Sequence, residues 1–414
     1  MKQINIGIIG LGVVGAAVAE VLHKNASAIA AQSGLRLLVK KGCDLRKVKV
    51  SCPVTTDAYE LINDREISII VETMGGVNPA KKFILDAIAA GKHVVTSNKE
   101  LIALHLDEIL ASAREHNVSV LYEASVGGGV PILGALRGNL AGNVLSEVYG
   151  IVNGTTNYIL STMSEEGKEF SEALKEAQAK GFAEANPKKD VEGYDAAYKT
   201  VILAAEAFGV RVKMDDVFRE GIEKITIEDI RYAREIGYAI KLLAIAKENA
   251  GSVDVRVHPA LVPLAHPLAG IRQNFNAIYV KGFPIGELMF YGPGAGGNPT
   301  ASAVIADLIE LGQTGRVFRR EIKAATVKKI DDVKARYYLR LQVSDKVGVL
   351  ASIAKVFAEK SVSIAAVIQK ETAQNTTTLV IMLDESSEKN MQSALNSIKK
   401  LSVVHHLGNL IRIL

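Results

Sequence analysis

Apolar and polar positions alternate with two different periods over the first 130 residues. Short apolar runs typical of buried strands occupy Ile4–Ile9, Leu35–Val39, Ile67–Glu72, His93–Thr96 and Val118–Tyr122. Stretches with helical periodicity lie between them, at Val13–His23, Asp57–Asn63, Pro79–Ala90 and Lys99–Asn117. Strands that alternate with helices predict βαβ units, and therefore a doubly wound parallel sheet with helices on both faces.

The pattern changes near the C-terminus. Tyr337–Val343 alternates as a strand, Gly348–Lys360 is helical, and two further strand-like runs, a helix over Glu388–Leu401 and a last strand over Val403–Leu414 follow. The order βαββαβ within about 80 residues predicts a ferredoxin-like domain over residues 335–414. Residues 323–334 are charged and short of large apolar side chains, which indicates a linker.

Three glycines follow the first predicted strand. Gly10, Gly12 and Gly15 have the spacing G-x-G-x-x-G, between a strand and a helix. The first permits a tight turn, the second lets the backbone approach a pyrophosphate, and the third lets the helix pack closely on the strand. This arrangement is the dinucleotide fingerprint of a Rossmann-type domain, with the phosphates at the helix N-terminus.

The same segment has a second interpretation. Lys2, the apolar run and Ala17-Val18-Ala19 resemble a secretory signal with a small-residue cleavage site. A signal peptide would not lead into a sheet that lacks its first strand. The βαβ pattern of the next hundred residues therefore favours the dinucleotide site.

The second strand bears on the choice of coenzyme. An NAD site places a carboxylate at the end of this strand to bind the ribose hydroxyls, whereas here the strand runs into Lys40 and Lys41. Basic residues suit the 2′-phosphate of NADP, and further ones follow at Arg46, Lys47 and Lys49. The alternative is a solvated lysine pair at a sheet edge, and Asp44 keeps NAD open. NADP is favoured over NAD.

Composition excludes several classes of protein. Two cysteines in 414 residues, Cys43 and Cys52, provide no disulfide framework, which indicates a reducing, cytoplasmic compartment. The 49 basic and 45 acidic residues are mixed along the chain, so no basic face for nucleic acid is indicated. No apolar run approaches the roughly 20 residues that span a membrane.

Candidate chemistry concentrates in three segments of the middle of the chain. In a predicted helix from Tyr194, Asp195 and Lys199 stand four residues apart on one face, where a carboxylate can orient an ammonium. Such a pair is more often a surface ion pair. Glu184 and Asp190 lie just upstream in a loop. The glycine run in EASVGGGVPIL can turn carbonyls toward a cation or serve as a flexible crossover, and Thr155 or Thr156 can cap a helix.

As a whole the sequence resembles homoserine dehydrogenase. The resemblance rests on seven blocks in that family's order: GLGVVG, VETMGG, TSNKEL, EASVGGGVP, NGTTNYIL, GFAEANPKKDVEGYDAAYK and GPGAGGNPTASAVIADL. It implies reversible, NAD(P)H-dependent reduction of L-aspartate 4-semialdehyde to L-homoserine, on the path to threonine and methionine. Because no aspartate-kinase region precedes these blocks, we expect the monofunctional form.

The resemblance also implies domains and an assembly. A nucleotide-binding domain is expected over residues 1–130, with a helix over 298–315 that returns to it, and an α+β catalytic and dimerisation domain over residues 131–322. The family implies a homodimer or homotetramer. SDKVGVLASIAKVFAEK, at the first strand–helix junction of the C-terminal domain, resembles an ACT domain, a small-molecule sensor.

Carried over residue by residue, the resemblance implies specific roles. Lys199 matches the proton donor and acceptor, Asp195 its carboxylate partner, and Lys99 a lysine between nicotinamide and substrate that can also transfer the proton. Substrate contacts are implied for Glu184, Asp190 and Thr155. Main-chain carbonyls are implied to bind sodium at Glu123, Val126, Gly128 and Val130. Coenzyme contacts are implied at Gly10, Gly12, Val13, Val14, Gly15, Thr73, Lys99, Gly294 and Gly296.

Regulation is a further expectation. Threonine feedback would act through the ACT domain near Asp345 and Gly348, and the alternative is an oligomerisation module without a ligand. Phe182 and Asn186 depart from the tyrosine and aspartate common in the family, which affects only the expected substrate contacts.

Two other functions compete with the dehydrogenase. The chain could be a regulatory protein that binds nucleotide and amino acid without turnover, but the four side chains for catalysis, Lys99, Glu184, Asp195 and Lys199, are all present. It could also be another ACT-bearing dehydrogenase such as phosphoglycerate dehydrogenase, but those enzymes carry the glycine fingerprint in mid-chain and use a histidine as acid and base.

Overall fold

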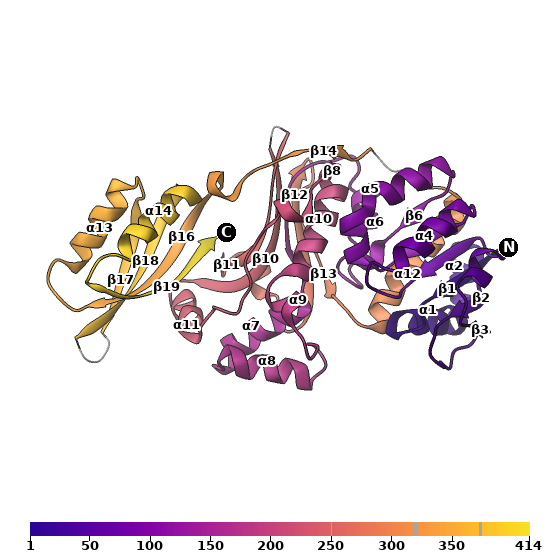
Figure 1. Ribbon diagram of the computed structural model, residues 1–414, viewed down its shortest axis with the longest axis horizontal. Coiled ribbons are helices and arrows are strands. Elements are labelled where there is room, and N and C mark those ends of the chain that lie inside the picture. Colours follow the sequence, from indigo (N-terminus) through magenta and orange to yellow (C-terminus); the bar gives the residue numbers. More distant parts are fainter. Residues whose placement is uncertain (250, 318–320, 372–374) are drawn as a thin grey trace. The chain divides into compact units, whose positions relative to one another are not determined.

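The computed structural model describes residues 1–249, 251–317, 321–371 and 375–414 (Figure 1). These residues form two compact units, each assembled from three segments of the chain. The first comprises Met1–Gly154, Asp195–Met214 and Phe275–Ala325, and the second Thr155–Tyr194, Asp215–Asn274 and Thr326–Leu414. Residues 1–130 lie in the first unit, residues 335–414 lie in the second, and residues 131–322 contribute to both.

A six-stranded parallel sheet forms the centre of the first unit. Its order is β3-β2-β1-β4-β5-β6, which is the strand order of a dinucleotide-binding fold. The strands are β1 (Lys2–Ile9), β2 (Leu35–Cys43), β3 (Val54–Thr55), β4 (Ile69–Glu72), β5 (His93–Thr96) and β6 (Val120–Leu121). The helices between them are α1 (Val13–Lys24), α2 (Ala26–Ser33), α3 (Tyr59–Ile62), α4 (Ala80–Ala89) and α5 (Lys99–Glu115). The predicted doubly wound sheet is confirmed, and the apolar N-terminal segment belongs to its core.

The strand β2 is longer than its apolar run. The sequence predicted a strand that ends at Val39, whereas the structure extends it to Cys43. Its pairing with β1 shifts register between Ile6 and Gly7, so that Val39 and Lys41 have partners on β1 and Lys40 is passed over. The lysine pair therefore lies within the strand instead of following it.

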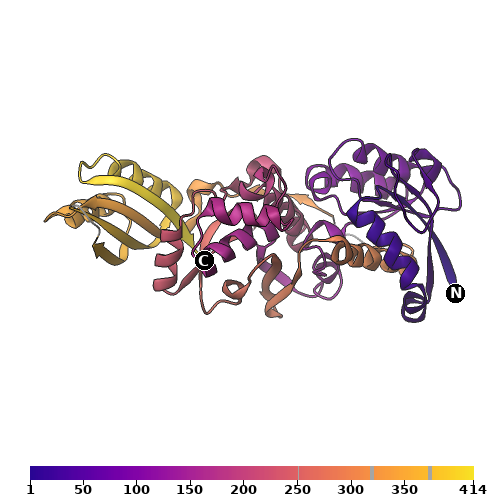
Figure 2. The same cartoon turned by 90° about the horizontal axis from the view of Figure 1, so that it is seen from below.

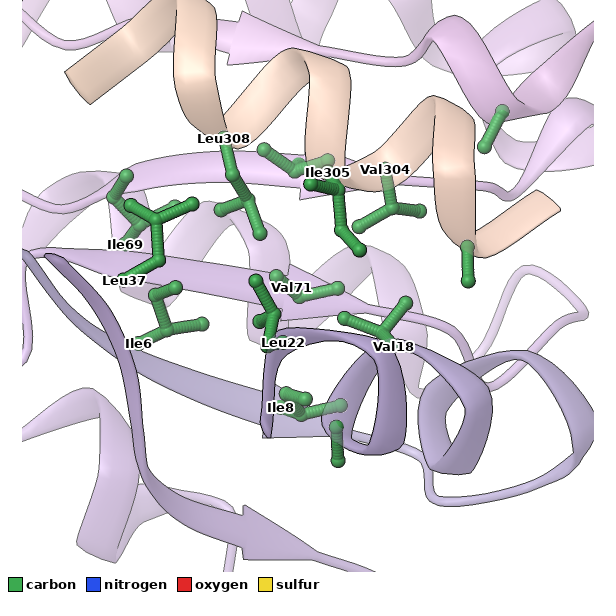
Figure 3. Packing of buried hydrophobic residues seen from close by; sticks show 14 of the residues in the cluster. Ile6, Ile8, Val18, Leu22, Leu37, Ile69, Val71, Val304, Ile305 and Leu308 are labelled. Carbon is green, nitrogen blue, oxygen red and sulfur yellow. The ribbon is translucent and has the colours of Figure 1, made fainter. Parts of the chain in front are cut away.

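One helix returns from late in the chain to this sheet. The helix α12 (Gly297–Thr314) lies beside α1 in Figures 1 and 2. Figure 3 shows Val304 and Leu308 of α12 directed toward the apolar cluster that contains Val18 and Leu22 of α1. The close approach depends on small residues, because a Cβ added to Gly297 would lie 3.2 Å from the Val13 carbonyl oxygen.

The remainder of the first unit includes three antiparallel strands. These strands pair in the order β13-β12-β7, and a separate parallel pair joins β8 to β14. The elements are η1 (Glu123–Ser125), α6 (Leu133–Arg137), β7 (Val144–Ile151), α10 (Tyr194–Phe208), β8 (Val210–Arg211), β12 (Phe275–Phe283), β13 (Gly286–Pro293) and β14 (Lys323–Ala324). The expected linker over residues 323–334 thus contains a short strand at its start.

The second unit joins a long hairpin to the C-terminal domain. The antiparallel strands β10 (Tyr238–Asn249) and β11 (Ser252–Pro263) form the hairpin, and β11 also pairs in parallel with the end of β19 (Val404–Ile413). Further elements of this unit are α7 (Gly154–Glu166), α8 (Phe170–Ala179), α9 (Lys188–Val191), η2 (Met214–Asp216), β9 (Phe218–Arg219), α11 (Ile227–Glu235), η3 (Pro267–Gly270), β15 (Thr326–Val327) and η4 (Ile330–Asp332).

The C-terminal domain has the predicted βαββαβ order. Four strands pair in the order β19-β16-β18-β17, and the two helices cover one face of the sheet (Figures 1 and 2). The new elements are β16 (Lys334–Ser344), α13 (Val349–Glu359), β17 (Ile364–Glu371), β18 (Thr376–Ser387) and α14 (Glu388–Ile398). Alternate residues of β16, among them Tyr337, Leu339 and Leu341, are buried beneath the helices with Ile353 and Phe357 of α13. The predicted ferredoxin-like domain is confirmed.

Buried ion pairs attach this domain to the rest of the second unit. Arg340 on β16 binds Asp229 on α11 at 2.7 Å, and Arg412 on β19 binds the partly exposed Glu220 at 3.0 Å. Within the domain, Arg412 also binds Glu388 of α14 at 2.8 Å. Because a buried ion without its partner is strongly unfavourable, the buried Arg340–Asp229 pair holds the domain against α11.

Candidate active site and coenzyme cavity

The turn after β1 has the geometry that a pyrophosphate requires. Gly10 has a φ of +94°, and a Cβ added there would lie 2.9 Å from the Met74 amide nitrogen. A Cβ added to Gly15 would lie 1.9 Å from the Gly10 carbonyl oxygen, so α1 packs directly on the turn. The same oxygen accepts a 2.6 Å hydrogen bond from the Thr73 hydroxyl, which joins the ends of β1 and β4.

A cavity of about 390 Å³ lies beside this turn. Gly10 and Gly12 line it on one side, Asp44 and Arg46 follow β2, and Thr73 lies at the end of β4. The remaining lining is largely apolar: Ile9, Cys43, Leu45, Thr56, Ala58, Met74, Pro79 and Phe83. Backbone at a helix N-terminus beside an apolar slot suits a dinucleotide, with its phosphates at the helix and its adenine in the slot. Val13 and Val14 begin the helix at this point.

Arg46 and Asp44 form a bidentate pair at the rim of the cavity. The guanidinium donates from Nε to Oδ1 and from Nη2 to Oδ2, each at 2.9 Å, and the Leu11 amide donates to Oδ2 at 2.8 Å. These hydrogen bonds from Arg46 outweigh burial and hold the pKa of the Asp44 carboxyl well below its usual range. The carboxylate that could bind the ribose hydroxyls of NAD is already bound to a cation.

The structure places Lys40 and Lys41 in other contacts. Lys40 forms ion pairs with Asp64 and Glu66, both at 2.7 Å, and Lys41 forms one with Glu60 at 2.8 Å. The hydrogen bonds that Lys40 donates to Asp64 and Glu66 raise the pKa of its ammonium group. Neither lysine lines the cavity, whereas Arg46 does.

A second group of charges lies on α10. Lys199 Nζ binds Asp195 Oδ2 at 2.7 Å and donates to the Val152 carbonyl oxygen at 2.6 Å. The Lys199 and Asp195 side chains are only 9% and 7% exposed, so this pair is not the surface ion pair that the spacing alone would favour. Lys199 is held by a carboxylate and a carbonyl in a site that largely excludes water.

Asp195 also binds the second lysine implicated by the sequence. Lys99, the first residue of α5, lies with its Nζ 2.8 Å from Asp195 Oδ1, and its side chain is 45% exposed. The Asn153 amide donates to Asp195 Oδ2 at 2.8 Å. Burial alone would raise the pKa of Asp195, but the charges of Lys199 and Lys99 outweigh it and hold this pKa well below the usual range. One ionised carboxylate therefore aligns two ammonium groups.

A buried polar network fixes the position of Lys99. Glu72, at the end of β4, accepts from the Thr96 hydroxyl at 2.6 Å and from the Met74 amide at 2.8 Å. Burial raises the pKa of Glu72. The Asn98 side chain caps α5 by accepting from the Leu101 amide, and it donates to the Gly76 carbonyl oxygen at 2.6 Å. The network joins the end of β4 to the N-terminus of α5.

The predicted substrate residues lie in the second unit. The Thr155 hydroxyl donates to the Phe182 carbonyl oxygen at 2.5 Å, which joins the start of α7 to the loop that carries Glu184. The Glu184 side chain is exposed, and its carbonyl oxygen accepts from Gln178 at 3.1 Å. Asp190 is half-buried on the short helix α9, five residues before Asp195 in the sequence.

The four residues expected to bind sodium through their carbonyls form a compact turn. Glu123 begins η1, and its side chain accepts hydrogen bonds from the Leu133 and Gly134 amides at the start of α6. The Val130 amide donates back to Gly127, which closes the turn that holds Val126 and Gly128. Main-chain carbonyl oxygens are donors that suit a hard cation, and two of the four already accept backbone hydrogen bonds, Glu123 from the Val126 amide at 3.3 Å and Val130 from the Ile132 amide at 2.9 Å.

The second glycine cluster packs against the same turn. A Cβ added to Gly128 would lie 2.4 Å from the Gly294 carbonyl oxygen, and one added to Gly294 would lie 2.1 Å from Asn276 Cγ. Gly296 has a φ of +116° and precedes α12. Only glycine fits these close approaches, which explains the cluster without reference to a ligand.

Asp345 and Gly348 lie between β16 and α13. Both are exposed, and Gly348, with a φ of +89°, immediately precedes the helix. They therefore lie at the strand–helix junction where the sequence predicted an effector site.

Known proteins match this chain along its whole length. Residues 131–309 match the family described as homoserine dehydrogenase, residues 10–123 match the homoserine dehydrogenase NAD-binding domain, and residues 337–403 match the ACT domain. The chain is 41% identical over 429 residues to homoserine dehydrogenase of Neisseria gonorrhoeae, covering 100% of this chain and 99% of the relative. The chain belongs to the homoserine dehydrogenase family.

Other relatives and solved structures agree. Homoserine dehydrogenase of Bacillus subtilis is 39% identical over 431 residues, covering 100% of this chain and 99% of the relative. The structure of a homoserine dehydrogenase from Thiobacillus denitrificans superposes with a TM-score of 0.95 at 40% identity, covering 100% of this chain and 99% of that one. The chain is therefore an NAD(P)-dependent oxidoreductase that carries an ACT domain, and the phosphoglycerate dehydrogenase alternative is wrong.

Sequence reasoning missed several residues that support the candidate active site. Glu72 and Asn98 hold the segments that carry Met74 and Lys99, and Asn153 binds Asp195. The sequence did contain a signal for Glu72, because this glutamate ends an otherwise apolar strand. An acidic side chain at such a position is buried only when it is hydrogen-bonded.

Two further features are absent from the part of the chain that the structure describes. Among the described residues, no helix combines the length and the apolar character that a membrane-spanning segment needs. Within the same residues, no group of three or more His, Cys, Asp or Glu side chains could hold a metal ion.

Proposed function

We propose that this chain reduces L-aspartate 4-semialdehyde to L-homoserine with Lys199 as the proton donor to the aldehyde oxygen. The observation that supports this assignment is the buried Lys199–Asp195 contact of 2.7 Å, completed by the Val152 carbonyl oxygen. When bound, NAD(P)H supplies the hydride that adds to the aldehyde carbon. The proton from Lys199 Nζ neutralises the negative charge that develops on oxygen, so the alcohol forms without a free alkoxide.

Asp195 and Lys99 complete the proposed proton-transfer site. Asp195 provides the counter-charge for the Lys199 ammonium group and fixes the direction of its N–H bonds. Lys99 binds the other oxygen of the same carboxylate but is far more exposed. We therefore assign Lys99 to the nicotinamide side of the reaction, where its positive charge stabilises the developing oxyanion, and assign the proton to Lys199.

Binding of the amino acid is assigned to the second unit. Glu184 and Asp190 supply carboxylates for the ammonium group of L-homoserine, and Thr155 supplies a hydroxyl. The exposed position of Glu184 and the short link between Asp190 and Asp195 support this proposal. We also propose that a sodium ion stabilises the turn that packs against Gly294. Its ligands would be the main-chain carbonyls of Glu123, Val126, Gly128 and Val130, a proposal that rests on their donor chemistry alone.

For the coenzyme we propose NADP over NAD, with Arg46 as the residue that binds the 2′-phosphate. Arg46 lines the cavity, is the partner of Asp44 and presents a fork of donors that matches a phosphate. The structure of a hyperthermophilic archaeal homoserine dehydrogenase mutant in complex with NADPH, 30% identical with a TM-score of 0.63 over 75% of this chain and 97% of that one, supports this choice. The contacts of Lys40 and Lys41 favour Arg46 over both.

We further propose that the ACT domain binds L-threonine near Asp345 and Gly348, and that the chain is a homodimer or homotetramer. Allostery requires that threonine bind two states of the protein with different affinity. A titration in which threonine changes neither the rate nor the thermal stability would contradict this proposal. The cytoplasmic location inferred from the cysteines stays a prediction.

The decisive experiment measures absorbance of the reduced nicotinamide while the purified chain oxidises L-homoserine, with NAD and NADP tested separately. We expect turnover with L-homoserine, none with 3-phosphoglycerate, and a higher kcat/KM with NADP. Folded protein that binds NADP without turning over L-homoserine would favour the regulatory binding protein instead.

A further inference from the structure

The segment Phe218–Ile222 contacts both the last strand of the chain and the turn before α10. Its first two residues form β9, which pairs in parallel with β11, and the next amide, that of Glu220, donates to the Val257 carbonyl oxygen at 2.8 Å. The strand β19 pairs with β11 a few residues further on, at Ala260 and Leu261. One strand therefore carries both this segment and the end of the ACT domain.

Arg412, on β19, joins the segment to the ACT domain. Its Nη1 binds Glu220 at 3.0 Å, and its guanidinium carbon lies 4.8 Å from the centre of the Phe218 ring. Nε and Nη2 bind the two carboxylate oxygens of Glu388 on α14, at 3.0 Å and 2.8 Å. The Arg412 side chain is only 4% exposed. Because a buried charge is costly without its partners, this guanidinium links a helix of the ACT domain to two residues of the segment.

The same segment also contacts the turn between α9 and α10. The guanidinium carbon of Arg219 lies 3.3 Å from the centre of the Tyr194 ring, and Tyr194 is the first residue of α10. A guanidinium over the face of a ring is an attractive cation–π contact. The Ile222 amide donates to the Val191 carbonyl oxygen at 2.9 Å. A Cβ added to Gly221 would lie 2.3 Å from that oxygen, so the segment and the turn are in direct backbone contact.

This turn lies next to residues that we propose for the reaction. Asp190, proposed to bind the substrate, directly precedes Val191, and Asp195 directly follows Tyr194. Because Asp195 aligns Lys199 at 2.7 Å, a displacement of the first turn of α10 would change the direction of the proton donor. Rates fall steeply when reacting groups are misplaced by even about 1 Å.

We propose that Arg412 and Arg219 are positioning residues for the reaction, and that the ACT domain acts on turnover through them. Arg412 holds the segment, and Arg219, with the backbone of the segment, holds the turn between Asp190 and Asp195. Contacts that follow one another without a gap can transmit a change in the C-terminal domain to the proton donor. The inference rests on the proposed function for its kinetic consequence, but the positioning itself can be measured without turnover.

Hydrogen exchange of the full chain, measured by mass spectrometry over residues 188–199, tests the positioning. Glu220→Gln removes the charge that binds Arg412, and because Glu220 is 39% exposed the variant should fold. We expect exchange over this peptide to accelerate at least about threefold in Glu220→Gln and in Arg219→Leu, since each change removes a contact that holds the turn. Glu223→Gln, which changes an exposed glutamate of the same loop, is the matched control and should exchange as the parent does. Parental exchange in the two test variants, or equal acceleration in the control, would overturn the proposal.

Steady-state kinetics test the link to catalysis. We expect Arg219→Leu to lower kcat/KM for L-homoserine by about threefold to tenfold, the loss of a cation–π contact, with the KM for NADP unchanged. Tyr194→Phe keeps the ring and should behave like the parent, whereas Tyr194→Leu should match Arg219→Leu. Parental kinetics in Arg219→Leu would show that this contact does not position the turn for catalysis.

The double variant Arg219→Leu/Glu220→Gln tests whether the two contacts act in one chain. If they do, its loss in kcat/KM should be smaller than the product of the two single losses. A loss equal to that product would show that the contacts act separately, and would overturn the link from the ACT domain. Parent protein that does not oxidise L-homoserine would contradict the proposed reaction, while the exchange measurement would still decide this inference.

Discussion

Lys199 Nζ lies 2.7 Å from Asp195 Oδ2, one helical turn earlier on α10, and both side chains are buried. If Lys199 delivers the proton, Lys199→Ala should lower kcat by about 10²- to 10⁴-fold, the usual contribution of a positioned acid. The Kd for NADP, measured by fluorescence, should be nearly unchanged. Lys175→Ala, an exposed lysine on α8, is the control. An unaltered kcat in Lys199→Ala would mean that Lys199 does not deliver the proton, and Lys99 would become the assigned donor.

Asp195→Asn removes the shared counter-charge of Lys99 and Lys199 without changing the size of the side chain. We expect a lower kcat and, at neutral pH, a lower midpoint of thermal unfolding, because two ammonium groups lose their partner. The folded-state pKa of Asp195 is depressed, so its stabilising charge is fully present above the unfolded value of about 4 and is lost as the pH falls below it. The difference in midpoint between variant and parent should therefore narrow below about pH 4. A constant difference would contradict this account.

Arg46→Gln tests the assignment of the coenzyme. Loss of a bidentate guanidinium contact to phosphate should raise the KM for NADP by about tenfold or more, while the KM for NAD changes little. Lys41→Gln is the matched control, because Lys41 binds Glu60 and does not line the cavity. If Lys41→Gln shifted the coenzyme preference and Arg46→Gln did not, the original assignment of the lysine pair would be correct.

Gly15→Ala tests the glycine turn. Its Cβ would lie 1.9 Å from the Gly10 carbonyl oxygen, so α1 must move away from the turn. We expect NADP binding to be lost and the unfolding midpoint to fall. Gly270→Ala is the control, since no atom lies within 4 Å of its added Cβ. Normal NADP affinity in Gly15→Ala would show that the phosphates do not bind at this helix.

Because the buried Lys241 on β10 has a lowered pKa, we expect the free energy of unfolding to rise at alkaline pH. Its Nζ donates to Asn157 Oδ1 at 3.2 Å and to the Ile271 carbonyl oxygen, and burial lowers its pKa from 10.5 to about 8. Between these values the unfolded chain binds more protons than the folded one, so the free energy of unfolding rises with pH, by up to about 3 kcal/mol.

Chemical denaturation of the parent and Lys241→Met from pH 7 to 10.5 measures this effect. The parent should gain stability relative to the variant over that range, because only the parent carries the titrating amine. Parallel pH profiles for the two proteins would show that Lys241 does not titrate with a lowered pKa.

The sequence by itself determined the local parts of this protein. The strand, glycine turn and helix around Gly10 and Gly15 follow from spacing, as does the alignment of Asp195 with Lys199 on one helix face. The βαββαβ order of the C-terminal domain likewise follows from periodicity. Each of these depends on the period of a single element or on residues a few positions apart, so backbone geometry alone fixes it.

Only the tertiary structure decided the partners that are distant in the sequence. It brought Lys99 to Asp195, placed Glu72 beneath the start of α5, and gave Lys40 and Lys41 carboxylates of their own while Arg46 reached the cavity. The sequence showed the charges but not which of several carboxylates each would meet. That choice depends on strand register and on the packing of helices, which bring together residues far apart in the chain. No periodic pattern in the sequence indicates such contacts.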